Sequence, residues 1–311
     1  MMNYKKIFRS RALRIKILQF LKFIPDKQMI RLQYFIKTGR HLNLNNPKRF
    51  TEKIQWYKLY YRDNKMIRCV DKYDVREYIK ELKLEWILTD CFGVYNSPEQ
   101  INISSLPNQF VLKDTLGGGG NSVVIVQNKS EIEIPALIKQ MRDWVSVADS
   151  YIDDGREWPY YYGKRHRIII EELLHTDSSE GLIDYKFFCF NGRVNYIYVI
   201  TDRELGKTIS LGIFDRNFQQ LNAYRADENK LTKKIDKPVN FDKMIQVSES
   251  ISKNFPHARV DLYNIKGRIV FGEITFYDGS GYMQFDPDSF DFKLGEEFKL
   301  PDRYNNLETR R

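Results

Sequence analysis

Phe110-Val-Leu-Lys-Asp-Thr-Leu-Gly-Gly-Gly-Gly-Asn-Ser-Val-Val-Ile-Val126 places a lysine, Lys113, and four consecutive glycines between two apolar segments of β type. Glycine has no Cβ, so the run of Gly117, Gly118, Gly119 and Gly120 lets the backbone turn freely and approach a ligand closely. Successive backbone N–H groups in such a loop can hold an anion such as phosphate. A strand and not a helix follows the glycines, which argues against a P-loop and a Rossmann turn. We expect a strand–loop–strand flap over a nucleotide; a plain glycine-rich hairpin turn is the alternative.

The composition sets limits on the class of protein. The chain has 311 residues, of which 42% are hydrophobic, enough for about two domains with substantial cores. Its three cysteines, Cys69, Cys91 and Cys189, lie far apart and match no zinc-binding or disulfide spacing. The four histidines are scattered as well, so no His/Cys constellation indicates zinc or a Cys–His nucleophile. We expect reduced cysteines in a cytoplasmic protein.

The positive charge is concentrated at one end of the chain. Residues 1–40 hold eleven Lys or Arg and a single acid, Asp26, whereas the whole chain has a net charge of +9. Lys16 and Lys22 interrupt the apolar residues of this basic arm, which is too short to span a bilayer and lacks a signal-peptide cleavage site. We expect residues 1–24 to contact an anionic membrane peripherally, at the inner face of the plasma membrane. The alternative is an ordinary helix with a solvated basic face, and no nucleic acid is expected as a partner.

The remainder of the chain alternates helical and strand patterns without internal repeats. Helical spacing is found at residues 50–61, with Thr51 as the expected cap, and at 71–79, 132–147 and 242–255. Strands are expected at 167–174, 211–214, 259–263 and 267–276, and Asn191-Gly192 predicts a hairpin over 183–200. This order favours an α+β fold with antiparallel hairpins over a regular βαβ alternation.

Asp261 and Glu273 lie on two strands joined by the turn 264–267. An antiparallel hairpin brings them onto one face with a modest offset, and Thr275 shares the face of Glu273. Mg²⁺ is usually held by one or two carboxylates together with substrate phosphates, so the pair predicts a magnesium site. The alternative is a cross-strand polar pair, or one acid paired with Arg259.

Taken in order, these segments resemble the ATP-grasp superfamily over residues 71 to about 285. The resemblance rests on a helix with Lys72, the Lys113 strand with its glycines, Glu171-Glu172-Leu173, Asp184-Tyr-Lys186, Arg259-Val-Asp261 and Glu273-Ile-Thr275. More narrowly, the chain resembles the TupA-like branch, named after the teichuronopeptide biosynthesis protein. That likeness rests on residues 50–59, 71–78, 184–192 and 272–276. Members of this branch occur among capsule and cell-wall polysaccharide genes and are often labelled glycosyltransferases.

The resemblance implies an ATP-grasp fold, in which two α+β subdomains clasp ATP. Residues 1–70 would form a short helical N-terminal region that includes the basic arm of residues 1–40. Residues 71–174 would form the small subdomain with the glycine-rich flap. Residues 175–311 would form the large subdomain with the metal-binding strands.

The resemblance also implies roles for individual residues. Lys72 and Lys113 would contact the ATP phosphates under the flap of Gly117–Gly120. Glu171, Glu172, Leu173 and Leu174 would form a hinge that reads adenine through backbone groups, and Asp184 would belong to the same ATP site. Asp261 and Glu273 would hold Mg²⁺, with Thr275 as a further oxygen ligand where many members have Asn. Lys186 and Arg259 would act in catalysis by neutralising charge on the phosphate and carboxylate.

These roles imply a carboxylate–amine ligase that works through an acyl phosphate in capsule or cell-wall polysaccharide synthesis. Its partners would be a carboxylate, such as a uronic acid or an amino acid, and an amine acceptor that is a free molecule, a glycan or a lipid-linked glycan. One alternative is a glycosyltransferase that uses a nucleotide sugar; Asp286-Pro-Asp288 has the spacing of its metal-binding carboxylates. Another is a non-catalytic scaffold that binds membranes through the basic arm.

Overall fold

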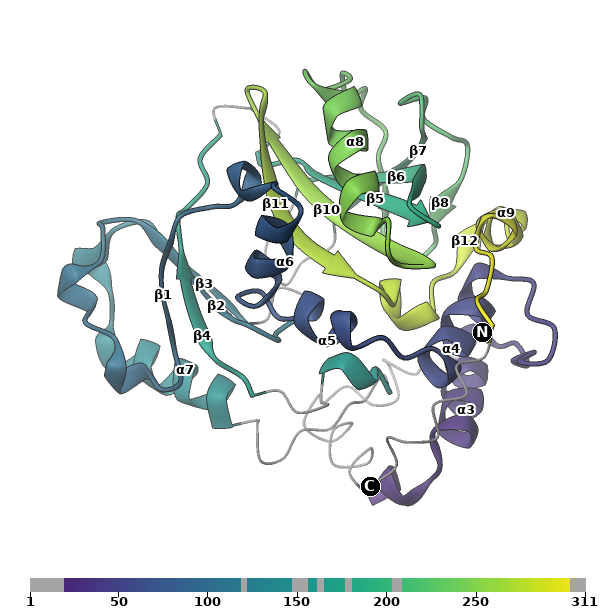
Figure 1. Cartoon of the computed structure of the whole chain (residues 1–311), viewed down its shortest axis with the longest axis horizontal. Helices are drawn as coiled ribbons and strands as arrows, with labels where there is room; N and C mark the ends of the chain where they lie inside the picture. Colours follow the sequence, from purple (N-terminus) through teal and green to yellow (C-terminus); the bar gives the residue numbers. More distant parts are fainter. Residues whose placement is uncertain are drawn as a thin grey trace.

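The fold was analysed in a computed structural model of the chain (Figure 1). The structure describes residues 20–118, 122–146, 156–160, 165–176, 181–202 and 209–302. Gly119, Gly120 and most of the basic arm, residues 1–19, lie outside the described residues.

Four helices open the described chain: α3 (Asp26–Thr38), α4 (Phe50–Tyr60), α5 (Asn64–Val70) and α6 (Val75–Glu81). Thr51 does not cap α4; the carboxylate of Glu52 instead accepts hydrogen bonds from the backbone N–H groups of Lys48 and Arg49, at 2.9 and 3.1 Å. The helix expected from residue 71 begins four residues later. The carboxylate of Asp71 accepts hydrogen bonds from the backbone N–H groups of residues 73 and 74, both at 2.9 Å, and these bonds form a turn. Lys72 therefore lies in this turn and not on a helix.

The smaller sheet contains β1 (Cys91–Tyr95), β2 (Phe110–Asp114), β3 (Val123–Val126) and β4 (Ile168–Glu171). Its strands are antiparallel and lie in the order β1-β4-β2-β3, so β2 and β3 form the hairpin that carries the glycine run. Helix α7 (Ile134–Ser146) covers one side of this sheet (Figure 1). The core between them consists of Leu106, Phe110, Leu112, Val126, Leu137, Met141, Trp144, Ile168 and Ile170.

The larger sheet has the strand order β11-β10-β5-β6-β7-β9. Its strands are β5 (Asp184–Phe190), β6 (Arg193–Thr201), β7 (Ser210–Asp215), β9 (Asn229–Lys230), β10 (His257–Ile265) and β11 (Arg268–Thr275). All pairs are antiparallel except β7 with β9. Strands β8 (Tyr224–Arg225) and β12 (Phe285–Asp286) form a separate two-stranded ladder. The remaining described α-helices are α8 (Phe241–Ser252) and α9 (Ser289–Glu297). Short 3₁₀ helices lie at Leu21–Phe23 (η1), Glu85–Ile87 (η2), Pro98–Gln100 (η3), Ile103–Ser105 (η4), Lys129–Glu131 (η5), Trp158–Tyr160 (η7) and Asp278–Gly281 (η8).

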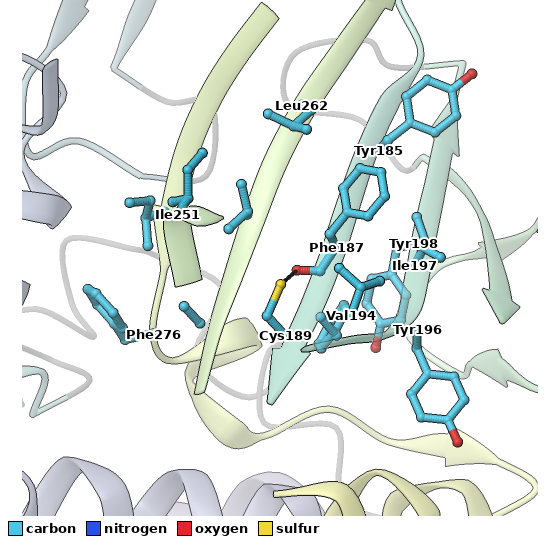
Figure 2. Close-up of a cluster of buried hydrophobic side chains, with 14 of the residues drawn as sticks. Tyr185, Phe187, Cys189, Val194, Tyr196, Ile197, Tyr198, Ile251, Leu262 and Phe276 are labelled. Carbon is cyan, nitrogen blue, oxygen red and sulfur yellow. Dashed lines mark hydrogen bonds between the residues drawn. The ribbon is translucent and has the colours of Figure 1, made fainter. Parts of the chain in front are cut away.

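The two faces of the larger sheet differ because side chains alternate along a strand. On β5, Phe187 packs toward α8, where its ring lies 6.1 Å from that of Phe241, and the thiol of Cys189 donates to the carbonyl of Ser248. Figure 2 shows Phe187 and Cys189 within this cluster of buried side chains. The intervening residues of β5 carry charge at Asp184 and Lys186 and point to the opposite face. The part of this face at Asp184 and Lys186 is therefore available for a site, whereas α4 packs on Phe188 farther along the strand.

The hydrophobic cores do not divide the chain at residue 71. The buried side chains of Val75, Tyr78 and Ile79 on α6 belong to the core of the larger sheet, as does Phe50 on α4. The ring of Phe50 lies 5.8 Å from that of Phe190, so the N-terminal helices pack directly on the larger sheet. The predicted domain boundaries stay a prediction.

Among the residues that the structure describes, none of the helices is both long and apolar enough to cross a membrane. The three cysteines are free, as expected from their spacing.

Candidate functional site

Four polar side chains form one row across the charged face of the larger sheet. Asp261 on β10 lies directly opposite Glu273 on β11 and opposite Lys186 on β5, and Lys186 lies opposite Tyr198 on β6. Directly opposed residues of antiparallel strands project to the same face. The strands continue to Ile265 and Arg268, which leaves a two-residue turn, and this register alone would place Gly272 opposite Asp261. A bulge in β11 opposite the step from Asp261 to Leu262 shifts the pairing by one residue, so that Glu273 lies opposite Asp261 without an offset.

Arg259, two residues before Asp261 on β10, connects the acids of this row. Its guanidinium donates two hydrogen bonds of 2.7 Å to the carboxylate of Asp261, and others to Glu273 at 3.1 Å and to the hydroxyl of Thr275 at 3.0 Å. It also bonds Asp278. Lys186 bonds Asp261 as well and forms an ion pair of 2.8 Å with Asp184. The predicted site residues on β5, β10 and β11 therefore meet in one network of alternating charge.

Asp278 is a member that the sequence analysis missed. It lies in η8, and its carboxylate is buried with one oxygen bonded to Arg259. Within the described ranges, the other oxygen, Oδ2, has no hydrogen-bond partner. The tight turn Asp278-Gly-Ser-Gly281, shortly after the strand predicted for residues 267–276, is the sequence signal that could have drawn attention to this place. It gave no indication that the side chain turns inward.

Burial and charge act against each other in this network. Burial raises the pKa of Asp261 to about 6, although Arg259 and Lys186 act to lower it. Burial acts to lower the pKa of Lys186, but the carboxylates of Asp184 and Asp261 outweigh it and raise that pKa. Arg259 likewise stays charged, because its carboxylate neighbours raise its pKa well above the ordinary value despite burial. The side chain of Glu273 is 43% exposed and is the open edge of the cluster.

The glycine hairpin of the smaller sheet carries a second group of cations. The ammonium of Lys72 donates to the carbonyl of Gly117, and its backbone N–H donates to that of Thr115 at 2.9 Å. Burial lowers the pKa of Lys72, although the negative charges of Glu273 and, to a smaller extent, Asp114 act to raise it. Lys72 therefore contacts the glycine loop and interacts electrostatically with the acid on β11.

Close packing fixes the base of the glycine loop. A Cβ on Gly117 would lie 2.5 Å from the Cβ of Ser122, closer than such atoms ever approach, whereas Gly118 has no atom within 4 Å of that position. The ring of His166 bonds the carboxylate of Asp114 at 2.8 Å. Of the two glycines of the run that the structure describes, Gly118 therefore has open space around it and Gly117 does not.

Lys113 has a buried acidic partner. Its ammonium lies 2.8 Å from the carboxylate of Glu171, which also accepts hydrogen bonds from Arg76 at 3.1 Å and from the hydroxyl of Thr89 at 2.9 Å. Burial acts to raise the pKa of Glu171, but Lys113 and these hydrogen bonds outweigh it, so the pKa lies below the usual range. The carboxylate of Glu171 therefore positions Lys113.

The chain after β4 connects the two sheets. The carboxylate of Glu172 accepts two hydrogen bonds of 2.9 Å from Arg268 at the start of β11. Leu173 and Leu174 follow and are half-buried. The adenine-reading role of this segment stays a prediction. A groove of about 440 Å³ lies next to it, between α6 and β1, and its lining includes Arg76 and Thr89 but none of Glu171–Leu174.

The carboxylates fit the predicted metal in their chemistry. Asp261 and Glu273 supply two hard oxygen donors on one face, the number that Mg²⁺ takes from a protein when phosphates supply others. Thr275 bonds Glu273 at 3.4 Å and lies on the same edge. In the part of the chain covered by the structure, no group of three or more His, Cys, Asp or Glu side chains could hold a metal ion alone. The metal roles of these residues stay predictions.

The Asp286-Pro-Asp288 pair has other partners. Asp288 accepts hydrogen bonds from Arg49 at 2.6 and 2.7 Å and from Arg40 at 2.5 Å, and Asp286 accepts one from Tyr224. Asp288 therefore ties the N-terminal helices to α9, which gives no support to a glycosyltransferase metal site there.

Comparison with known proteins gave one family and several distant structures. The protein-family model described as TupA-like ATPgrasp matches residues 52–299. The chain is similar to D-alanine–D-alanine ligase from Bacillus anthracis, at 17% identity over 74% of this chain and 67% of that one, with a TM-score of 0.45. It is similar to L-amino acid ligase from Bacillus licheniformis, at 16% identity over 74% of this chain and 49% of that one (TM-score 0.44).

A third similar structure is the ATP-grasp ligase PsnB complexed with minimal precursor, Mg and ADP. The identity is 11% over 80% of this chain and 66% of that one, with a TM-score of 0.39. The chain thus spans about half to two thirds of the length of these proteins. No curated protein matches it.

Proposed function

The chain belongs to the TupA-like ATP-grasp family, and from that premise we propose that it is an ATP-dependent carboxylate–amine ligase. The resemblance expected from the sequence is confirmed by the family match, and with it the α+β ATP-grasp fold. ATP-grasp enzymes bind ATP. The glycosyltransferase and the non-catalytic scaffold remain the competing hypotheses.

One observation carries the proposal: a cation that bonds the glycine hairpin also interacts electrostatically with an acid of the larger sheet. Lys72 bonds the carbonyl of Gly117 and has Glu273 as its strongest charged neighbour. Lys113 projects from the same hairpin with 30% of its side chain exposed. A polyphosphate between these groups would find positive charge and backbone N–H groups on one side and a metal-binding edge on the other.

The proposed reaction has two steps. An oxygen of the substrate carboxylate attacks the γ-phosphorus of ATP, which forms an acyl phosphate and releases ADP. The nitrogen of an amine then attacks the acyl carbon and loses a proton, while the bond between that carbon and the phosphate oxygen breaks. The products are an amide and inorganic phosphate, which takes up the proton. Lys186 and Arg259 would neutralise charge on the phosphoryl and carboxylate oxygens, so that the protein contributes positioning and electrostatic stabilisation.

Asp261 and Glu273 would hold Mg²⁺, with Thr275 at the same edge. When bound, the ion would shield the negative charge between the phosphates. Arg259 and Lys186 bond Asp261 in the structure, and we propose that they keep the buried carboxylate oriented toward that position.

We further propose a setting in capsule or cell-wall polysaccharide synthesis, at the cytoplasmic side of the membrane. The support is the branch to which the chain belongs. The carboxylate would then be a uronic acid or an amino acid, and the amine acceptor a free molecule or part of a glycan.

The nucleotide is tested by thermal shift with Mg-ATP and with UDP-sugars. Mg-ATP should raise the Tm, and a UDP-sugar alone should not. Lys113→Ala and Glu273→Ala should each abolish the shift with Mg-ATP, because one removes a phosphate contact and the other a metal ligand. Lys139→Ala on α7 and Glu133→Ala just before α7, both at exposed positions, are the matched controls and should behave as wild type. Stabilisation by a UDP-sugar but not by Mg-ATP would favour the glycosyltransferase.

The substrate pair is tested by a screen of amino acids and uronic acids for ADP formation, with and without added amines. A ligase should form ADP only with its carboxylate and should yield an amide once the amine is present. ADP formation that is independent of any carboxylate would contradict the proposed reaction.

A further inference from the structure

The outward face of α3 is apolar and basic at once. Exposed residues recur at spacings of one and four along the helix, which places them on a single stripe. Leu32, Phe35 and Ile36 are 44, 47 and 41% exposed, and Lys27 and Arg31 lie on the same stripe. Burying large apolar side chains is favourable, so this stripe is suited to contact with another apolar surface.

The opposite face of α3 is fixed to the body of the protein. Gln33 accepts a hydrogen bond of 2.7 Å from the hydroxyl of Tyr282, and the carbonyl of Lys37 accepts one of 2.9 Å from Gln284. Ile30 and Tyr34 are fully buried on this side. The helix therefore cannot turn its exposed stripe inward without losing these contacts.

Two further aromatic residues extend the apolar surface toward the basic arm. Phe20 and Phe23, just before α3, are 78 and 74% exposed, the highest values among the exposed large hydrophobic residues of the described chain. Figure 1 shows this segment and α3 at one end of the molecule, away from the smaller sheet. The apolar side chains thus continue past the helix itself.

The charge around this surface is strongly positive. Residues 1–40 carry eleven Lys or Arg, and their single acid, Asp26, is 2.7 Å from Arg156 and so is already paired. Residues 41–311 have a net charge of about −1, by difference from the total of +9. A partner for this end of the molecule must therefore combine negative charge with an apolar interior.

We propose that Phe20, Phe23 and the outward face of α3 form a docking surface for an anionic lipid bilayer. Apolar side chains enter the boundary of the acyl chains while Lys and Arg contact the anionic headgroups. A second copy of the chain would bring the two basic arms together, and the like charges would repel. Nucleic acid would contact the cations but would leave the aliphatic Leu32 and Ile36 exposed.

Docking would also place the candidate site near the bilayer. Tyr282 and Gln284, which hold α3, directly follow η8, and η8 carries the carboxylate that bonds Arg259. A substrate attached to a lipid would then reach the charged face of the larger sheet from the membrane. This consequence rests on the proposed function, whereas the docking surface itself does not.

The test is sedimentation of the full chain with vesicles, without nucleotide. Vesicles of phosphatidylcholine with about a third phosphatidylglycerol should bind at least tenfold more tightly than pure phosphatidylcholine, and added salt should weaken the binding. Leu32→Glu/Phe35→Glu should reduce binding at least tenfold. Ile134→Glu/Val239→Glu makes the same charge change at apolar positions that are 46 and 70% exposed and should bind as wild type. Leu32→Ser/Phe35→Ser isolates the apolar contribution and should also weaken binding.

Several results would overturn the docking surface. Equal binding to the two kinds of vesicle would remove the anionic lipid as the partner. Equal binding by the Leu32/Phe35 and Ile134/Val239 variants would remove α3 as the surface. A dimer in light scattering that the Leu32/Phe35 variant disrupts would assign the face to a second copy, and salt-sensitive RNA binding lost in that variant would assign it to nucleic acid. Glu273→Ala should still bind vesicles, so that failure of the ligase proposal and failure of the docking surface can be told apart.

Discussion

Arg259 donates two hydrogen bonds of 2.7 Å to the carboxylate of Asp261 on the same strand, and both side chains are buried. A buried carboxylate without a cation is strongly unfavourable. The same guanidinium also bonds Glu273, Thr275 and Asp278. One cation therefore neutralises several acids that would otherwise repel each other at the edge of the candidate site.

Replacement of Arg259 should be costly to the fold. Arg259→Ala leaves buried carboxylates unpaired, and we expect a loss of about 3–5 kcal/mol in the free energy of unfolding. Arg259→Lys should lose less, since it keeps the charge but lacks the planar fork that serves several acceptors. Urea denaturation measures both. Arg142→Ala, which removes an exposed partner of Glu99, is the control and should change stability by less than about 1 kcal/mol. A loss of similar size in Arg142→Ala and Arg259→Ala would contradict the interpretation.

Gly281 is where α4 meets η8. It has a φ of +67°, and a Cβ there would lie 2.5 Å from Nε2 of Gln55 and 2.7 Å from Cγ2 of Ile54. Gly281→Ala should therefore destabilise the protein by about 2–4 kcal/mol through backbone strain and overpacking. Gly118→Ala meets no atom within 4 Å, so its free energy of unfolding should stay within about 1 kcal/mol of wild type. Chemical denaturation of the two variants gives their free energies of unfolding. Equal values would contradict the prediction and show that α4 shifts to accommodate the added Cβ.

Lys113 allows ligand binding and stability to be separated. Lys113→Met removes the ammonium, but Arg76 and Thr89 still bond Glu171, so the loss of stability should be about 1 kcal/mol. The Kd for Mg-ATP should rise at least tenfold, because a phosphate contact is lost. Calorimetric titration and urea denaturation of the same samples test both statements. Lys80→Met, at an exposed position paired with Glu77, is the matched control. An unchanged Kd would remove Lys113 from the nucleotide site.

The sequence predicted the elements that local patterns determine. The β2–β3 hairpin follows from apolar segments on both sides of the glycines, and the opposition of Asp261 and Glu273 follows from the hairpin that joins their strands. The absence of an offset depended on the two-residue turn of Lys266 and Gly267, which both have positive φ, and on a bulge that brings Glu273 instead of Gly272 opposite Asp261. Turn length is poorly determined by composition alone.

Contacts between distant segments could not be predicted in this way. Lys58 on α4 is fully buried; its ammonium donates to the carbonyl of Ser280 at 2.8 Å and lies over the ring of Tyr282. These partners lie more than 200 residues away in the sequence. Asp278 was missed for the same reason, because its importance comes from Arg259, 19 residues earlier on another element. Helix periodicity does not reveal which tertiary neighbours satisfy a buried charge.

His257 should make the stability of the protein sensitive to acid. Its ring is fully buried, 4.9 Å from Phe190 and 5.1 Å from Phe50, and its Nδ1 donates to the carbonyl of Cys189 at 3.0 Å. Burial lowers the pKa of His257 from 6.5 to about 4. Between these values the unfolded chain binds a proton that the folded chain does not, so stability is fully present above pH 6.5 and falls toward pH 4.

The expected loss from His257 alone is about 2 kcal/mol between pH 7 and pH 5. His257→Phe cannot bind a proton and retains the aromatic packing, although it loses the hydrogen bond to Cys189. Its stability at pH 7 should therefore be lower than that of wild type, while its further loss at pH 5 should be smaller by about 2 kcal/mol. Urea denaturation of both proteins at the two pH values gives this difference directly. His175→Phe, at an exposed position, should leave the pH dependence as in wild type. An identical pH dependence in wild type and His257→Phe would show that the ring is protonated without cost in the folded protein.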